Sequence, residues 1–215
     1  MRKALMIIGI VGAVSVFGAS SVMAANTVDV NMGAAIDGTY GLEVGVDGSP
    51  NVAFVQDDSP AGETVYRAQF WVDRNTPTIA NRDAYKIFKG VMDTGNKKNI
   101  LIKLKRGKDG NFYVYAFCQT DSNTWTWADK GMQFKDKATG VMIEWQASSA
   151  PGADDGFLRM YKVTLTDTVL KGSRTGIDND TKVVDAARLG LTSAPPAGTA
   201  SLYFDSFESY RTLAP

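Results

Sequence analysis

The stretch Glu63-Thr64-Val65-Tyr66-Arg67-Ala68-Gln69-Phe70-Trp71-Val72-Asp73 carries the clearest periodicity of the sequence. Its side chains alternate between two faces of an extended chain, one formed by Tyr66, Ala68, Phe70 and Val72 and the other by Val65, Arg67, Gln69 and Trp71. A period of two residues is typical of a β-strand. We therefore predict a strand with one apolar face in the core and one partly wet face.

Segments of the same kind lie on both sides of this strand. They are residues 41–46, 52–55, 85–92, 100–105, 111–119, 124–127, 141–147, 157–165 and 201–210. Each is bounded by Gly, Asp, Ser or Pro, which are the residues of turns. Roughly ten short strands about ten residues apart predict an all-β, antiparallel sandwich or barrel. The only stretch with helical character, residues 183–189, is too short for the crossovers of a parallel sheet.

The composition excludes several classes of protein. The chain has 215 residues, with 23 Lys and Arg, 23 Asp and Glu, no His and one Cys. Balanced charge argues against a nucleic-acid binder, which normally carries an excess of basic residues. The absence of histidine excludes Ser-His-Asp and Cys-His catalytic machinery. A single cysteine excludes an internal disulfide and a cysteine-based zinc site.

The first 24 residues have the pattern of an export signal. Arg2 and Lys3 precede an apolar run, and Val22-Met23-Ala24 ends it with the residues that signal peptidase prefers. We predict a signal peptide over residues 1–24, cleaved after Ala24, then an N-terminal lead-in over residues 25–37 and a single β-sandwich domain over residues 38–212. No second long apolar segment follows, so we expect an exported protein, extracellular or periplasmic, without a transmembrane anchor.

Three motifs resemble the concanavalin A-like lectin/glucanase superfamily, in particular the laminin-G-like jelly-roll modules of secreted bacterial proteins. The motifs are residues 66–73, Gly176-Ile177-Asp178-Asn179-Asp180-Thr181 continuing to Ala187-Arg188-Leu189-Gly190, and Tyr203-Phe204-Asp205-Ser206-Phe207-Glu208-Ser209. The resemblance spans residues 38–212 and implies a two-sheet antiparallel jelly roll. Many members of this superfamily bind glycans or mediate surface contacts, and some are glycosidases.

The glucanases of that superfamily carry Glu-x-Asp-x-x-Glu on one strand, because retaining hydrolysis needs two carboxylates close together on one face. This sequence has no such string. Glu144 has no acidic residue two positions away, and Asp205 and Glu208 are three positions apart, which places them on opposite faces of a regular strand. A carboxylate pair from different strands stays open. We therefore predict no catalytic residue and a non-enzymatic protein, with an atypical glycoside hydrolase as one alternative.

Aromatic rows at strand spacing are the candidate ligand-binding residues. Flat rings with a polar rim suit the apolar face of a sugar, although aromatic residues on strands are more often part of a core. The candidates are Tyr113 and Tyr115, Trp125 and Trp127, Trp71 with Arg67 and Gln69, and Tyr161 with Arg159. Which of the rows 113–117 and 125–127 faces water is left open by the sequence.

Acidic and basic clusters raise two further questions about ligands. Asp178 and Asp180 lie in a turn and are candidates for Ca²⁺, although turns need Asp and Asn for their own geometry. We expect no other cofactor. Lys97, Lys98, Lys103, Lys105, Arg106 and Lys108 cluster around one hairpin. Such a cluster either protects a solvated strand edge or binds a polyanion.

Together these observations predict an exported, non-enzymatic, lectin-like module whose partner is a glycan or another surface polymer. A structural or assembly protein of the cell surface or extracellular matrix, which uses its sheets for self-association, is the alternative from another class. Nucleic acid is not an expected partner, because the chain carries no basic excess.

Overall fold

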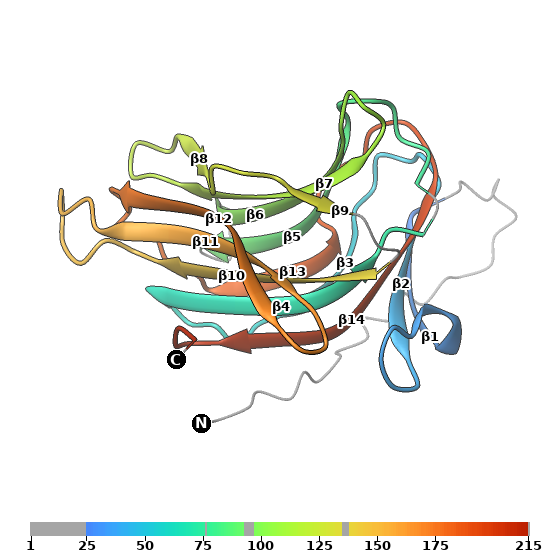
Figure 1. Ribbon diagram of the computed structural model, residues 1–215, viewed down its shortest axis with the longest axis horizontal. Coiled ribbons are helices and arrows are strands. Elements are labelled where there is room, and N and C mark those ends of the chain that lie inside the picture. The colour runs from blue at the N-terminus through green and yellow to red at the C-terminus, as the bar shows by residue number, and fades with distance from the viewer. Residues whose placement is uncertain (1–24, 76, 93–96, 135–137, 215) are drawn as a thin grey trace, which may run out of the picture.

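Two antiparallel sheets packed face to face make up the computed structural model, which describes residues 25–75, 77–92, 97–134 and 138–214 (Figure 1). The predicted all-β, antiparallel two-sheet architecture is confirmed. Sheet A has the order β1 (Thr27–Asn31), β2 (Gly41–Val46), β14 (Ala200–Tyr210), β4 (Val65–Asp73), β10 (Ala138–Gln146), β11 (Gly156–Val163), β12 (Thr168–Ile177). Sheet B has the order β3 (Ala53–Asp57), β13 (Ala186–Leu191), β5 (Ala84–Met92), β6 (Lys97–Arg106), β7 (Phe112–Gln119), β8 (Trp125–Trp127), and β9 (Met132–Phe134) also pairs with β7.

The core lies between the two sheets and is built from one face of most strands. Strand β4 behaves as its periodicity predicts, since Tyr66, Ala68, Phe70 and Val72 are fully buried. The ring of Phe70 stacks on Phe88 of β5 with centroids 5.8 Å apart, which joins the sheets at their centre. The opposite face of β4 is therefore an outer face of the sandwich.

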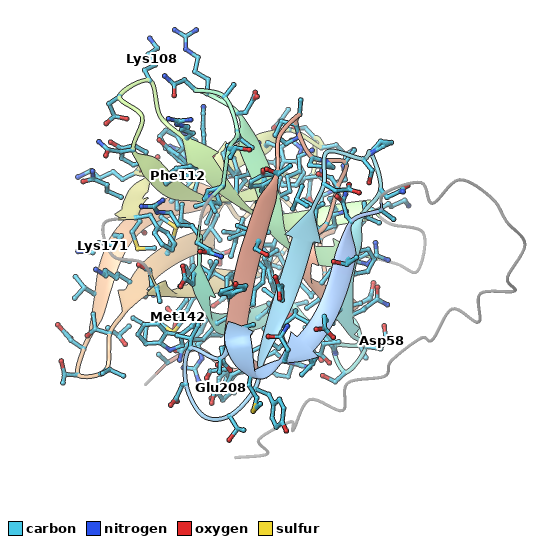
Figure 2. The ribbon with its side chains drawn as sticks, turned by 90° about the vertical axis from the view of Figure 1, so that its right-hand side faces the viewer. Asp58, Lys108, Phe112, Met142, Lys171 and Glu208 are labelled. Atoms are coloured by element: carbon cyan, nitrogen blue, oxygen red, sulfur yellow. The ribbon has the colours of Figure 1, made fainter. Side chains whose placement is uncertain are left out.

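The strands bend in a common direction. In Figure 1, β4, β7 and β14 all rise toward the upper right, so the outer face of sheet B lies on the inside of the bend. Figure 2 shows the same arrangement from the side: Phe112 and Lys108 belong to the upper layer, and Met142 and Glu208 lie at the bottom, on the outer face of sheet A.

The structure corrects the helical character expected at residues 183–189. Residues Ala186–Leu191 form strand β13, which is paired with β3 on one side and with β5 on the other. Local preference for a helix is overridden because a central strand satisfies its backbone groups on both sides and buries Ala187, Leu189 and Leu191.

The sequence-based prediction omits both edge strands of sheet A, as well as the short strand β9 of sheet B. Strand β1 lies within the lead-in at residues 25–37 and pairs with β2, and a short 3-10 helix (Met32–Ala34) follows it. Strand β12 pairs with β11 and is exposed along most of its length. Both strands bury few side chains, so they lack the alternation that identifies a half-buried strand. Among the described residues, no helix is long and apolar enough to cross a membrane.

Candidate functional site

The candidate ligand-binding residues fall into two groups on opposite sides of the sandwich. Arg67, Gln69 and Trp71 of β4, with Arg159 and Tyr161 of β11, lie on the outer face of sheet A. Tyr113 and Tyr115 of β7, with Trp125 and Trp127 of β8, lie on the outer face of sheet B. The two groups are separated by the core, so no single ligand-binding site contains both.

The group on sheet A is engaged in contacts within the protein. Glu144 is 2% exposed and lies directly between Arg67 and Arg159 in the strand register. Its Oε2 accepts a hydrogen bond from the Tyr161 hydroxyl at 2.7 Å and lies 3.8 Å from Arg159 Nη1. The guanidinium of Arg67 stacks 4.1 Å from the ring of Tyr210. These contacts stabilise the outer face of sheet A. Gln69 and Trp71 take no part in them.

Strand β7 turns its aromatic row outward. Phe112, Val114, Ala116 and Cys118 face the core, so Tyr113, Tyr115 and Phe117 occupy the outer face, where they are half-buried. Strand β8 continues this surface: Trp127 is 40% exposed and its ring lies 5.8 Å from Tyr115 and 6.5 Å from Phe117. Both aromatic rows therefore face water, and they form one continuous surface.

Lysine side chains cover the neighbouring strands of the same face. Lys103 of β6 lies directly opposite Tyr115 and Lys86, and Lys105 lies opposite Tyr113. The Lys103 Nζ sits 4.4 Å from the centre of the Phe117 ring. Such cation–π contacts hold the lysine ends beside the aromatic rings without neutralising them.

A β-bulge in β5 brings two more lysines to this surface. The register of β5 against β6 shifts between Lys86 and Phe88, so Ile87 and Phe88 both point into the core. Lys86 and Lys89 are three positions apart and nevertheless share the outer face. Sequence reasoning missed both, because a regular strand would place them on opposite sides.

We call this surface the basic–aromatic face. It consists of Lys86, Lys89, Lys103, Lys105, Tyr113, Tyr115, Phe117, Trp125 and Trp127.

Positive charge on the basic–aromatic face is concentrated and uncompensated. Burial and the nearby Lys98 and Arg188 lower the pKa of Lys89 to about 8. Burial lowers the pKa of Lys103 as well, with repulsion from Lys86 and Lys105 adding to it. Strands β5, β6, β7, β8 and β13 contain no Asp or Glu. Within the described residues no carboxylate forms an ion pair with the four lysines of this face, so the face favours an anionic ligand.

Three contacts fix parts of this surface in place. The Lys89 Nζ donates a hydrogen bond to the backbone oxygen of Thr192 at 2.8 Å. The Tyr113 hydroxyl donates to Asp109 Oδ2 at 2.7 Å, and this bond raises the pKa of Tyr113. The ring of Tyr115 lies against the backbone of Gly131, where a Cβ would come within 2.5 Å of the ring. Tyr115 is thus held by the loop that follows β8.

The acidic turn that contains Asp178 and Asp180 lies beside a third carboxylate, which the sequence did not indicate. Asp178 and Asp180 approach Asp121, and one carboxylate oxygen from each lies within 4.8 Å of the others. Burial and the neighbouring Asp121 raise the pKa of Asp180. The Asp121 carboxylate also accepts hydrogen bonds from the amide and hydroxyl of Thr181, which serves the geometry of the turn. A spacing of 57 residues in the sequence conceals the proximity of Asp121 and Asp178.

Comparison with known proteins identifies similarity at the level of fold. No protein-family model matches the chain, and no curated protein matches its sequence. The endo-β-1,4-glucuronan lyase from the fungus Trichoderma reesei superposes with a TM-score of 0.61 and 13% identity, over 98% of this chain and 96% of that one. The cellulose-induced protein Cip1 gives a TM-score of 0.57 and 14% identity, over 91% of this chain and 90% of that one.

A third structure contains a similar domain within a longer chain. It is a chain of botulinum neurotoxin type C, whose cell entry depends on interaction with two ganglioside molecules. Its TM-score is 0.55 at 14% identity, with 89% of this chain and 43% of that chain covered. At these identities the likeness shows the fold alone: a jelly-roll β-sandwich of concanavalin A-like architecture, as the sequence motifs predict.

The prediction of a non-enzymatic module is contradicted by the first of these structures. That prediction rested on the missing Glu-x-Asp-x-x-Glu string, which concerns hydrolysis by two carboxylates. The same fold serves a polysaccharide lyase. Elimination requires a base, a proton donor and a group that neutralises a carboxylate, so the missing acidic pair does not exclude catalysis.

Proposed function

We propose that the protein binds an acidic, uronate-containing polysaccharide across the basic–aromatic face and cleaves it by β-elimination. The observation that carries the proposal is the group of four lysines on β5 and β6, which, like the neighbouring β7 and β8, contain no Asp or Glu. Ammonium groups attract the uronate carboxylates, and the adjoining rings of Tyr115, Phe117 and Trp127 suit the apolar faces of sugars. The fold shared with a glucuronan lyase supports this choice of polymer.

The groups on this face suit elimination better than hydrolysis. In elimination a base removes the proton at C5 of the uronate, the electron pair forms the C4=C5 double bond, and the C4–O4 bond breaks. The leaving oxygen takes a proton from an acid. Lys105 and Lys86 would hold the carboxylate, which makes the C5 proton more acidic.

Lys103 and Tyr115 are the base and the acid in this proposal. They are direct cross-strand neighbours, and burial and adjacent lysines lower the pKa of Lys103, which increases its neutral, proton-accepting form. The Tyr115 hydroxyl would donate to the leaving oxygen.

Conversion of a polyuronate by the purified mature chain tests the activity. The product of each cut carries a double bond conjugated to its carboxylate, which is measured by ultraviolet absorbance. We expect Tyr115→Phe to retain binding and lose about two orders of magnitude in rate, because the ring stays and the proton donor is removed. Equal rates in Tyr115→Phe and the parent protein would contradict the role of Tyr115. Absence of both binding and product with every acidic polysaccharide would reject the function.

Export is part of the proposal, because the polysaccharide substrate is expected outside the cytoplasm. Residues 1–24 lie outside the described residues, so the signal peptide and its cleavage after Ala24 stay predictions. A relationship to the laminin-G-like modules is likewise proposed on the three sequence motifs. Mass spectrometry of the exported chain tests the cleavage site, which we expect to leave Ala25 as the first residue.

We also propose a Ca²⁺ site at Asp121, Asp178 and Asp180, favoured by the convergence of three carboxylates at one rim of the sandwich. Ca²⁺ that binds only the folded state raises the melting temperature by mass action. We expect such a rise in the parent protein and none in Asp121→Asn. A melting temperature that is the same in Ca²⁺ and in chelator would reject this site.

A further inference from the structure

Charge is distributed unevenly across the basic–aromatic face. Its four lysines lie on β5 and β6, whereas β7 and β8 contribute aromatic rings and no charged residue. The two halves meet where Lys103 contacts the Phe117 ring and where Lys105 lies 6.0 Å from the Tyr115 ring. A ligand that crosses the strands therefore passes from a cationic half onto an uncharged, aromatic half.

The surroundings of β8 offer an anion little net positive charge. Asp121 follows the end of β7, and with Asp178 and Asp180 it forms a group of three carboxylates. Lys182 offsets part of this charge, since its Nζ donates a hydrogen bond to Asn123 Oδ1 at 2.9 Å beside the group. Asp129, after β8, is 3.7 Å from Arg174, and Lys130 is a further cation of that loop. A uronate over Trp125 or Trp127 would therefore lack the uncompensated lysines of β5 and β6, whereas a neutral sugar needs no such partner.

The width of the face allows both halves to act on one chain. Three strand intervals separate β5 from β8, which corresponds to roughly 14 Å at the usual strand spacing. That distance exceeds one sugar ring and suits a short oligosaccharide. The exposed ring of Trp127 and the half-buried ring of Phe117 offer stacking area beyond the reach of the β5 lysines.

We infer that the ligand is a mixed polysaccharide, in which an acidic unit over Lys86, Lys103 and Lys105 is followed by an uncharged unit over Phe117 and Trp127. This inference rests on the proposed function and specifies its substrate class. It distinguishes heteropolymers of uronate and neutral sugar from polymers composed of uronate alone.

The test compares two oligosaccharides of equal length, one composed only of uronate and one in which uronate alternates with a neutral hexose. Affinity is measured by calorimetry with the mature chain, with Trp127→Ala and with the control Tyr40→Ala, whose exposed ring lies away from this face at the β2 end of sheet A. We expect the mixed oligosaccharide to bind more tightly to the parent protein. Trp127→Ala should lower its affinity roughly tenfold while changing the homopolymer little, and Tyr40→Ala should change neither.

Two results would overturn the inference and leave the proposed function intact. They are tighter binding of the homopolymer, and an equal loss of affinity for both oligosaccharides in Trp127→Ala. Failure of both oligosaccharides to bind the parent protein would instead reject the proposed function itself. Circular dichroism and the melting temperature establish that each variant is folded before affinities are compared.

Discussion

Individual side chains show where sequence reasoning succeeds and where it stops. The alternation of β7 predicts correctly that Tyr113 and Tyr115 share a face, because a strand has a fixed period. It does not reveal which face is wet, because both rows of β7 are rich in apolar residues. The contribution of Asp121 to the acidic group depends on contact between distant loops, which no local pattern encodes.

Asn179 illustrates a residue whose role is structural. Its side chain is fully buried, and its Oδ1 accepts a hydrogen bond from the Ser148 amide at 2.8 Å. Replacing it by Ala leaves buried groups unsatisfied, which costs about 1–3 kcal/mol of unfolding free energy. Chemical denaturation measures the loss, with exposed Asn51→Ala as the control expected to change stability by less than about 0.5 kcal/mol. Equal stability of the two variants would contradict the account of Asn179.

Lys89 should give folding stability a distinct pH dependence. Its pKa is lowered to about 8 in the folded protein, from the ordinary value of 10.5. Between these values the unfolded chain binds the proton more tightly, so this lysine makes stability rise with pH by up to roughly 3 kcal/mol. We expect denaturation at pH 7.5, 8.5 and 9.5 to show that rise in the parent protein and a flatter profile in Lys89→Met. A parent profile as flat as that of the variant would show that Lys89 titrates normally.

At the scale of elements, the bulge in β5 decides the composition of the site. Hydrophobic alternation predicts the strand itself, yet the bulge between Lys86 and Phe88 adds one residue and reverses the side chains that follow it, up to a second register shift between Gly90 and Val91. The basic cluster predicted around the hairpin includes Lys103 and Lys105 of β6. It omits Lys86 and Lys89 of β5, because the bulge that places them on one face is not visible in the sequence pattern. Most strands were predictable because each buries one face, whereas the edge strands β1 and β12 were not, because most of their residues are exposed.

The loop after β8 should control the position of Tyr115. A Cβ at Gly131 would approach the Tyr115 ring to 2.5 Å, and the ring is at the end of a side chain that can move. We expect Gly131→Ala to displace the ring and lower the rate on a polyuronate about tenfold or more, with little change in melting temperature. A large fall in melting temperature would instead show that the loop supports the fold.

For the whole molecule, the two outer faces have different roles. Sheet A joins its arginines to Glu144 and Tyr210, whereas the lysines of sheet B have no carboxylate partner among the described residues. The sequence predicts the sandwich and shows a balanced net charge, which conceals a strongly basic local surface. Net charge is a property of the whole chain, and binding depends on how the fold distributes it.

The affinity for a soluble polyuronate at increasing salt concentration tests the central claim most directly. Each lysine that contacts the polyanion contributes to the slope of log affinity against log salt. We predict a steep slope for the parent protein, a shallower slope for Lys86→Gln and Lys105→Gln, and an unchanged slope for Lys171→Gln on β12 of sheet A. An affinity independent of salt, or an equal loss in all three variants, would contradict binding at the basic–aromatic face.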